Sequence, residues 1–356
     1  MKTTLLSLLI LTLSISASAQ DADMGTSAKP FSHLDLSVTA GSTGIGVDLS
    51  APLTDWLDVR AGASITPRIK IPGDYTLQVG DKPEKPTYDK NGNLQQTKLE
   101  KIQELMYGLT GYEIDQTIRM NRMPSIQNVK LLFDIKPLKN KNWHATVGFY
   151  YGSRKIAYAE NDITECSSLC GVAMYNNMHR MAVNNIPITV GYDDVYINST
   201  LAKRFKAYGK MGVPMGSFVN DIYDDNGTLL HAKGSTFLLE PDGDNLVKAY
   251  CYANSFRPYV GIGYSGAMSK KNDNWRIGVD LGAMYWGKTS LITTRKEQTS
   301  AYNDASERWE TTNYFYDIDL TRDVENLPSS ISHQVKLIKS LSIYPVAELR
   351  ITYRIF

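Results

Sequence analysis

Cysteine and histidine are both scarce in this sequence, which has 3 cysteines and 5 histidines among its 356 residues. No histidine stands at metal-ligand spacing beside Cys166, Cys170 or Cys251, and His179 is the nearest one. Zinc sites are built from cysteine and histidine at short, regular spacings. We therefore predict no metal site and no cofactor.

Hydrolase motifs are missing as well. The sequence has no Gly-x-Ser-x-Gly elbow and no His-Glu-x-x-His run, the local patterns that point to a serine esterase or a zinc protease. Ser332 and His333 are neighbours in a segment expected to be helical, where adjacent side chains face apart. His144 alternates with apolar residues and is expected to face a packed interior. We predict no catalytic residues.

An excess of charge of either sign is absent. The chain has 38 lysines and arginines against 37 aspartates and glutamates, a net charge of +1. Nucleic-acid-binding surfaces need clustered positive charge, and no basic cluster stands out, so nucleic acid is not expected as a partner. Tyrosine is abundant instead, with 22 residues against 9 phenylalanines. Such a composition suits a membrane–water interface and exposed binding loops alike.

Long apolar runs are confined to the start of the chain. Lys2 is followed by the apolar run Leu5–Ile15 and by Ala17-Ser18-Ala19, which is the pattern of a secretory signal peptide with its cleavage site. We predict a signal peptide over 1–19 and a mature chain over 20–356. No later segment approaches the ~20 apolar residues of a spanning helix, so any membrane crossing must use the strands of a closed barrel.

Export would place the three cysteines in an oxidising compartment, where disulfides persist. Cys166 and Cys170 are four residues apart, and Cys251 follows in the same long segment between predicted strands. We predict one disulfide within 154–256, with the pairing left open, and one remaining thiol.

Apolar and polar residues alternate in eight segments, as expected for strands with one apolar face. In the last of them every second residue from Ala347 to Ile355 is apolar, and the residues between are charged or threonine. We predict an all-β fold, a transmembrane antiparallel up-and-down barrel of eight strands, with ten strands as the alternative. The eight segments cover 34–40, 44–51, 57–65, 129–136, 143–151, 259–265, 275–285 and 345–356.

The polar faces of these segments carry six acids and six bases. Burying an unpaired ion costs several kcal/mol, and eight strands enclose a space just wide enough for side chains to fill. We therefore predict a packed ionic interior and no wide channel. The predicted interior charges are Asp35, Asp48, Asp58, Arg60, Lys130, Asp134, Lys136, Arg276, Asp280, Glu348, Arg350 and Arg354.

Three short polar joins, at 52–55, 137–142 and 270–274, each lead into a tryptophan at the start of a strand. Short periplasmic turns and aromatic girdles at both interfaces are typical of outer-membrane barrels. The predicted girdle residues are Trp56, Trp143 and Trp275 on the periplasmic side and Tyr285 and Trp286 on the opposite side.

The remaining joins are long, apart from a tight one at 41–43. They cover 67–125, 154–256 and 288–342 and so occupy most of the mature chain. We interpret them as large extracellular insertions in a single barrel domain over 20–356. Both chain termini would then lie in the periplasm, because an even number of strands returns the chain to its starting side.

The long joins contain their own structural signals. Apolar residues at helical spacing predict helices near 98–109 and over 323–339, and the side of the membrane on which the second helix lies is left open. Asn-Gly pairs predict hairpins at 90–93 and 222–230. These small elements contain no recognisable motif from which a ligand could be identified.

Three stretches of the chain carry a family resemblance: Asp35–Leu53 with Thr54-Asp55-Trp56, Ser255–Tyr264, and Tyr344–Phe356. With these, the chain resembles the outer-membrane β-barrel proteins of Bacteroidota, in the broad eight-stranded OmpA-like and porin-T-like superfamily. The resemblance covers the strands and leaves out most of the long joins. It implies an integral protein of a Gram-negative outer membrane, with terminal Phe356 as the signal read by the barrel-assembly machinery. It supplies no catalytic residues.

The predicted function is a surface scaffold whose large loops bind or adhere to an unknown extracellular ligand or host molecule, because loops on rigid scaffolds commonly carry binding. Outer-membrane lipid and the barrel-assembly machinery are the other expected partners. A narrow channel, or a component of an uptake or secretion complex, is the alternative, and an outer-membrane hydrolase is the least favoured reading.

Overall fold

The structure is a computed structural model of the chain. It describes residues 30–138, 141–190, 193–224, 227–269 and 272–356. The predicted signal peptide, over 1–19, lies outside these residues. No helix in the described part of the chain is long and apolar enough to span a bilayer.

Eight antiparallel strands form a closed barrel in which the strands follow one another in chain order. The first and last strands close it, with Asp35 opposite Arg354 and Gly41 opposite Glu348. The predicted fold class is confirmed, including the number of barrel strands. The barrel strands are β1 (Asp35–Gly41), β2 (Gly44–Thr54), β3 (Leu57–Ile65), β7 (Gln127–Ile135), β8 (Trp143–Gly152), β17 (Phe256–Ser269), β18 (Asn272–Tyr285) and β22 (Ile343–Arg354).

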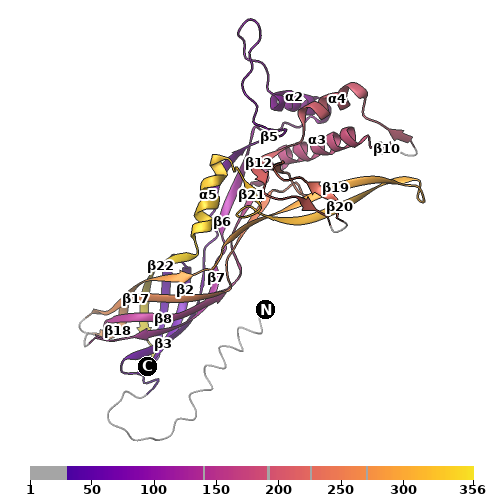
Figure 1. Cartoon of the computed structure of the whole chain (residues 1–356). Coiled ribbons are helices and arrows are strands. Elements are labelled where there is room, and N and C mark those ends of the chain that lie inside the picture. Colours follow the sequence, from indigo (N-terminus) through magenta and orange to yellow (C-terminus); the bar gives the residue numbers. More distant parts are fainter. Residues whose placement is uncertain (1–29, 139–140, 191–192, 225–226, 270–271) are drawn as a thin grey trace.

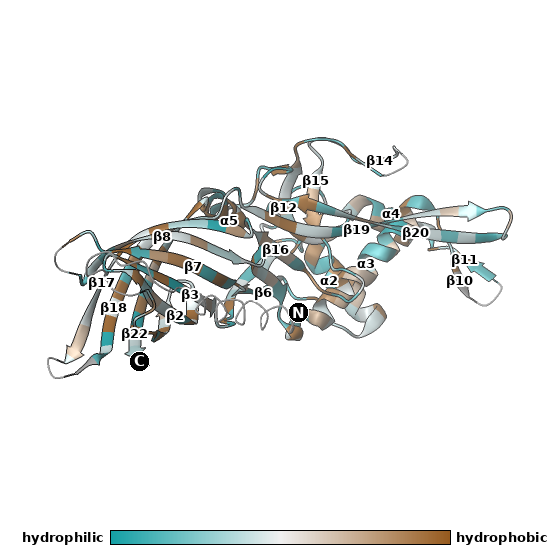
Figure 2. Ribbon diagram, turned by 90° about the horizontal axis from the view of Figure 1, so that it is seen from below, coloured by the Kyte–Doolittle hydropathy of each residue, from teal (hydrophilic) through white to brown (hydrophobic). Residues whose placement is uncertain are grey.

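Side chains alternate between the two faces of each barrel strand, as the pleat requires. On β22, Leu349 and Ile351 are exposed on the outside, whereas Glu348 and Arg350 are buried inside. Figure 2 shows this alternation as bands of opposite hydropathy along the barrel strands. The barrel therefore has an apolar outer wall and a polar interior.

The two ends of the barrel differ in the length of their connections. At one end, short turns join β2 to β3, β7 to β8, and β17 to β18. The same end holds Asp35 of the first strand and Arg354 of the last strand. One of these turns is tighter than predicted, because Thr54 pairs with Leu57. Residues 139–140 and 270–271, within the predicted second and third joins, lie outside the described part.

At the other end, one wall of the barrel continues into a second sheet. The neighbours β7, β8, β17 and β18 are prolonged by β6 (Thr117–Pro124), β9 (Lys155–Asn161), β16 (Lys248–Tyr252) and β19 (Ser290–Asn303). The prolongations pair in the same order, β6 with β9, β9 with β16 and β16 with β19. Figure 1 shows these long strands running from the barrel into the rest of the molecule. The barrel strand β3 is followed, after residues 66–70, by β4 (Ile71–Thr76), which pairs with β6 and so extends the same strand order.

The three long segments at this end, 66–126, 153–255 and 286–342, fold together into what we call the distal domain. It has a hydrophobic core of its own, in which Ile102, Tyr175, Phe205, Met211 and Phe237 are fully buried. The core joins parts of all three segments, so these are not independent loops. Helix α5 (Ser329–Ser340) lies between the barrel and the rest of this domain (Figure 1).

The distal domain consists of a six-stranded sheet, a smaller four-stranded sheet, two short hairpins and a set of helices. Its strands are β4 (Ile71–Thr76), β5 (Gln78–Val79), β6 (Thr117–Pro124), β9 (Lys155–Asn161), β10 (Ile188–Val190), β11 (Asp193–Val195), β12 (Met211–Phe218), β13 (Ile222–Tyr223), β14 (Leu229–His231), β15 (Thr236–Leu239), β16 (Lys248–Tyr252), β19 (Ser290–Asn303), β20 (Arg308–Asp319) and β21 (Val324–Glu325). Its helices are α2 (Lys98–Thr110), the 3-10 turn η2 (Ile163–Glu165), α3 (Cys166–Asn184), α4 (Ser199–Tyr208) and α5 (Ser329–Ser340).

The helix predicted near 98–109 is confirmed as α2. Thr97 and Glu100 form a reciprocal capping box at its start, and Gly111 ends it in the left-handed conformation, so both ends of the helix are satisfied locally. The hairpin at 90–93 is confirmed by the Tyr88–Leu94 bridge. The hairpin at 222–230 is confirmed by the pairing of β13 with β14.

The helix predicted over 323–339 begins later than expected. Val324 and Glu325 form β21 against β12, and the helix α5 starts at Ser329, directly after Pro328. Proline lacks the N–H that a helix interior needs and restricts the residue before it, so residues 323–328 cannot join the helix. Thr289 donates to the carbonyl of Ile338, which places α5 at the long-connection end.

Candidate functional site

The middle of the barrel is crossed by ion pairs centred on Arg60. Its Nη1 lies 2.9 Å from Asp280 Oδ2 and its Nη2 lies 3.1 Å from Asp134 Oδ1. Asp280 also contacts His144 Nε2 at 2.7 Å through its other oxygen. Arg350 completes the layer at 3.6 Å from Asp134 and 3.7 Å from Asp280. Charges from opposite walls therefore neutralise one another across the lumen.

A second ionic layer, nearer the distal domain, is centred on Lys130. Its Nζ lies 2.9 Å from Asp48 Oδ2 and 2.9 Å from Glu348 Oε1. Thr43 donates to Glu348, and Arg60 lies 4.0 Å from Asp48, so the two layers are linked. The side chains of Lys130 and Asp48 are fully buried. Because burying an unpaired charge costs several kcal/mol, these two charges can be buried only if they pair with each other.

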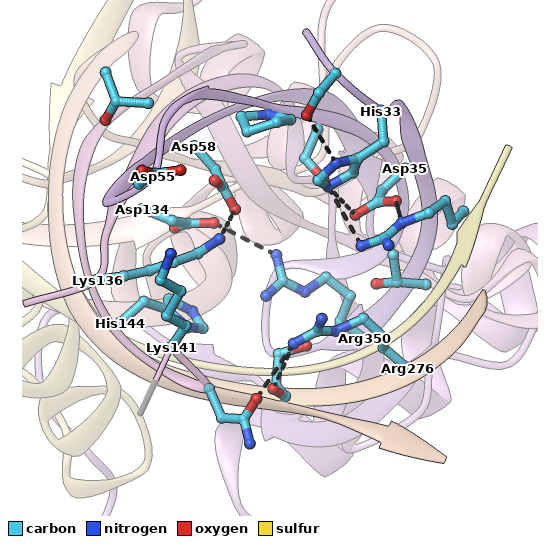
Figure 3. A pocket seen from close by; sticks show the side chains of 18 residues that line it. His33, Asp35, Asp55, Asp58, Asp134, Lys136, Lys141, His144, Arg276 and Arg350 are labelled. Atoms are coloured by element: carbon cyan, nitrogen blue, oxygen red, sulfur yellow. Dashed lines mark hydrogen bonds and ion pairs between the residues drawn. The ribbon is translucent and has the colours of Figure 1, made fainter. Parts of the chain in front are cut away.

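The short-turn end of the barrel holds a polar cavity of about 260 Å³, which we call the vestibule. Figure 3 shows Asp58 and Lys136, paired at 2.5 Å, on one side of it and the His33–Asp35 pair, at 3.6 Å, on the other. The ionic layer around Arg60 lies at its inner end, where Arg350 points into the cavity. The vestibule therefore ends inside the barrel at the ionic layer around Arg60.

Aromatic side chains close the lumen toward the distal domain. Tyr150 and Tyr259 meet edge to face with ring centroids 5.4 Å apart. Trp286 stacks on Tyr344 at 4.1 Å, and all of these side chains except Tyr344, which is partly buried, are buried in one cluster. Between the vestibule and the distal domain, the lumen thus holds two buried ionic layers followed by this aromatic cluster.

The predicted interior charges divide between these two regions. Seven are buried in the ionic layers, namely Asp48, Arg60, Lys130, Asp134, Asp280, Glu348 and Arg350. Five line the vestibule, namely Asp35, Asp58, Lys136, Arg276 and Arg354. Arg354 lies 3.4 Å from Asp35, whereas Arg276 donates to the carbonyl of Ser265.

One fully buried charge was missed by the sequence analysis. Arg257 donates to Asn128 Oδ1 at 2.6 Å and to the carbonyls of Asn254 and Ser153. The predicted strand began at 259, two residues too late. Tyr259 begins the inward-facing row of that predicted strand. Residues two apart share a face of a strand, so a strand that started two residues earlier would have placed Arg257 in the same row.

Four of the five predicted girdle residues are exposed on the outer surface of the barrel. The exposed fractions are 54% for Trp56, 47% for Trp143, 46% for Trp275 and 51% for Tyr285. The prediction for Trp286 is wrong, because its side chain is only 3% exposed. Adjacent strand residues point to opposite faces, so Tyr285 outside requires Trp286 inside.

Terminal Phe356 lies at the short-turn end with its side chain exposed. Its carbonyl accepts a hydrogen bond from the backbone of Leu34 at 3.2 Å, so the last residue continues the closing strand pair. Recognition of Phe356 by an assembly machinery remains a prediction.

The distal domain contains a second polar cavity, of about 190 Å³, between α3, β19 and the segment 240–245. We call it the distal cleft. Arg180 reaches into it from α3, donating to Ser300 Oγ at 2.5 Å and to Asn177 Oδ1 at 2.9 Å. Gln298 and Lys296 face it from β19. Amides and cations that converge in this way are suited to a polar ligand.

A buried ionic cluster supports the floor of the distal cleft. Arg295 lies 3.0 Å from Glu240 and 2.5 Å from Glu297, and His231 lies 3.1 Å from Glu297. Burial opposes the charge of Glu297, but the His231 hydrogen bond and the charges of Arg295 and Lys210 outweigh it and hold the Glu297 pKa well below its usual range. Glu297 is therefore ionised and fixed in place.

The predicted disulfide is wrong: Cys166, Cys170 and Cys251 are all free thiols. Cys166 and Cys170 lie on successive turns of α3, and Cys251 is buried on β16 in the cluster that closes the barrel. Residues four apart on a helix have Cβ atoms ~5–6 Å apart, which is farther than the ~3.5–4.5 Å of a disulfide, and Cys251 belongs to a different packing unit. Among the described residues, no group of three or more histidines, cysteines and carboxylates is placed to hold a metal ion.

No protein-family model matches the chain, and no curated protein matches it. Among solved structures, it is similar to CarO2 of Acinetobacter baumannii at 13% identity and a TM-score of 0.35, over 92% of this chain and 99% of that one. It is also similar to a major outer membrane protein from Thermus thermophilus at 11% identity and a TM-score of 0.28, over 93% of this chain and 100% of that one. These values describe a distant likeness in form. Membership of a Bacteroidota family remains a prediction.

Proposed function

We propose that the protein is an integral outer-membrane barrel that displays the distal domain at the cell surface as a binding module. The membrane location is supported by the outer wall of the barrel. On β8, outward side chains run from Trp143 to Tyr151. Nine residues at ~3.3 Å each, tilted by ~40°, span roughly 23 Å, which is close to the apolar band of an outer-membrane barrel.

The asymmetry of the two barrel ends supports an orientation. Outer-membrane barrels have short turns in the periplasm and long connections outside. The short turns share one end with Asp35 and Arg354, and the distal domain forms the other end. We infer that the termini and the vestibule face the periplasm and that the distal domain faces the cell exterior.

The observation that carries the binding role is the structure of the distal domain itself. Its three segments share one hydrophobic core and are fused to a barrel wall by four prolonged strands. A rigid domain with a polar cleft is better suited to recognising a ligand than to gating a pore. The lining of the cleft favours a polar ligand that forms hydrogen bonds.

The buried ionic layers argue against the alternative of a narrow channel. Ions entering from the vestibule would have to break the Arg60–Asp280 and Arg60–Asp134 pairs. The side chains of these residues are 1%, 4% and 6% exposed for Arg60, Asp280 and Asp134. We therefore expect the purified protein to be silent in planar lipid bilayers. Stable unitary conductance steps would overturn the scaffold reading in favour of a channel.

Protease treatment of intact cells tests the orientation. The exposed β19–β20 turn at 304–307 and the loop at 82–93 belong to the distal domain, and we expect cuts there. The turns around Asp55 and Lys141 belong to the opposite end and should be cut only after the outer membrane is permeabilised. Cuts at Asp55 or Lys141 in intact cells would invert the topology.

A further inference from the structure

We propose that Lys155 and Arg154, with the tyrosines that surround them, bind the phosphate group of an anionic lipid in the outer leaflet. The inference rests on the proposed membrane location of the barrel. It adds a specific lipid contact at the outer edge of the membrane, distinct from the distal cleft.

The position of this cluster follows from the strand register. Tyr151 lies opposite Phe256 at the upper edge of the apolar outer wall, and both side chains are exposed. Lys155 lies opposite Tyr252 on the prolongations of the same two strands. Four residues of strand at ~3.3 Å each carry Lys155 roughly 13 Å along the chain from Tyr151. At a tilt of ~40° this is roughly 10 Å along the membrane normal, which places Lys155 beyond the hydrocarbon edge, at the outer boundary of the head-group region.

A register shift turns this cluster toward the outside. The pairing of β16 with β9 is irregular between Cys251 and Tyr252. Ile156 and Cys251 are buried in the cluster that closes the barrel, whereas Lys155 and Tyr252 are only partly buried. An extra residue in one strand re-aims the side chains next to it. The irregularity therefore keeps Lys155 on the outer face, in line with the apolar wall below.

Two tyrosine rings hold the Lys155 ammonium group. Its Nζ lies 5.6 Å from the ring centroid of Tyr158 and 5.2 Å from that of Tyr250. The ring of Tyr252 lies 6.4 Å from that of Tyr250 and extends the aromatic surface. Contacts with the faces of aromatic rings attract a cation without neutralising it. The ammonium group is thus positioned in advance for an anionic ligand.

Neither cation has an acidic partner. Within the described residues, no carboxylate lies at ion-pair distance from Lys155 or Arg154. Lys248, farther along β16, is by contrast paired with Asp242 at 3.3 Å. Arg154 is exposed and lies within electrostatic reach of Tyr252. Asp317 of β20 also lies within electrostatic reach of Tyr252, but it forms no ion pair with either cation among the described residues. The cluster therefore presents two positive charges without a direct ion-pair partner on one small aromatic surface.

This combination matches the chemistry of a phosphorylated lipid head group. Tyrosine places its apolar ring at the membrane interface and its hydroxyl in the head-group layer. Ammonium and guanidinium groups donate charge-assisted hydrogen bonds to phosphate oxygens. Each basic residue near an anionic surface contributes ~1 kcal/mol, which corresponds to about a fivefold change in affinity.

Native mass spectrometry of the full-length protein in detergent tests the proposal. The probes are diphosphorylated lipid A and zwitterionic phosphatidylethanolamine, added at equal concentration. We expect the wild type to retain lipid A under activation that removes phosphatidylethanolamine. Lys155→Ala should weaken lipid A retention about fivefold, and Arg154→Ala with Lys155→Ala about 25-fold.

Two matched variants give the test its specificity. Lys155→Arg keeps the charge and should retain lipid A, whereas Lys248→Ala removes a lysine that is already paired and should bind as the wild type does. Equal retention by the wild type and the Lys155→Ala variant would overturn the proposal. Equal losses in the Lys155→Ala and Lys248→Ala variants would also overturn it, because the effect would then be one of general surface charge.

The same samples separate this proposal from the membrane location on which it rests. Each variant is first located by fractionation of the cell envelope. Absence of the wild type from the outer-membrane fraction would overturn the proposed function. Presence in that fraction, with lipid A retention unchanged by Lys155→Ala, would overturn only the lipid site.

Discussion

Arg60 and Asp280 connect opposite walls of the barrel, with Arg60 Nη1 2.9 Å from Asp280 Oδ2. Arg60 belongs to β3 and Asp280 to β18, which are four strands apart in either direction around the eight-stranded wall. A contact between two side chains across the full width leaves little room for anything else. The pair therefore fixes the cross-section of the barrel and separates the vestibule from the distal domain.

Replacing Arg60 with alanine should strongly destabilise the barrel. Asp280 and Asp134 would lose their hydrogen bonds from Arg60, and Asp48 would lose a nearby positive charge. Removing one partner of a buried ion pair costs about 3–5 kcal/mol. Urea titration of the protein in lipid vesicles, followed by tryptophan fluorescence, would measure the loss.

Arg276→Ala serves as the matched control for Arg60→Ala. Arg276 also faces the interior, but it is partly exposed in the vestibule and donates to the carbonyl of Ser265. Its loss should change the free energy of unfolding by less than about 1 kcal/mol. Equal destabilisation by both variants would mean that the layer around Arg60 has no special role.

Gly263→Ala should disrupt the same layer from a different direction. A Cβ atom at Gly263 would overlap Asp280 Oδ1 and His144 Nε2, the two atoms that form the 2.7 Å contact. Overpacking of this kind costs typically 1–3 kcal/mol. Heat-modifiable migration on gels would report a lower folded fraction for Gly263→Ala after refolding.

Gly266 lies on the same strand, β17, and provides the comparison. The nearest atom to a Cβ there is Tyr264 Cε1, at 3.4 Å, which is ordinary van der Waals contact. Gly266→Ala should therefore fold like the wild type. A loss of folding in both variants would indicate that β17 requires glycine for its backbone alone.

The barrel could be predicted from the sequence because each strand carries its own signal. A period of two assigns every residue to a face without reference to any other strand. The interior position of Asp280, for example, follows from the apolar residues Val279 and Leu281 on either side. Trp286 was assigned to the outer girdle because it is aromatic, although the period of two places it on the face opposite to that of its neighbour Tyr285.

The distal domain could not be predicted because its contacts join residues far apart in the chain. Tyr75 shares a hydrogen bond with Gln334, 259 residues away, and β12 pairs with both β5 and β21. Neither relationship leaves a local pattern. The distal cleft shares this origin, since it combines α3, β19 and the segment 240–245.

Thiol labelling should distinguish the three cysteines by burial. All three are free, Cys166 and Cys170 are partly exposed, and Cys251 is 6% exposed. On the native, unreduced protein we expect a thiol reagent to label Cys166 and Cys170 and to label Cys251 only after unfolding. Mass spectrometry of the labelled peptides provides the count. A bridge between any two of them would restore the original sequence prediction.

Acid should weaken the distal domain through Glu297. The pKa of Glu297 lies below its value of 4.5 in an unfolded chain, because His231 and Arg295 stabilise the carboxylate more than burial destabilises it. A carboxylate with a lowered pKa contributes stability above the unfolded pKa, and this contribution is lost as the pH falls toward the folded pKa. Glu297→Gln should therefore destabilise the domain by about 1–3 kcal/mol at pH 7, with a difference from the wild type that shrinks below about pH 5.

Hydrogen–deuterium exchange of the α3 and β19 peptides, corrected for the intrinsic exchange rate at each pH, would measure this difference. Glu307→Gln, at an exposed turn of the distal domain, should match the wild type throughout. A difference between the wild type and the Glu297→Gln variant that stayed constant from pH 7 to pH 3 would show that the effect of Glu297 does not depend on its charge. The ionic cluster beneath the distal cleft would then act by packing alone.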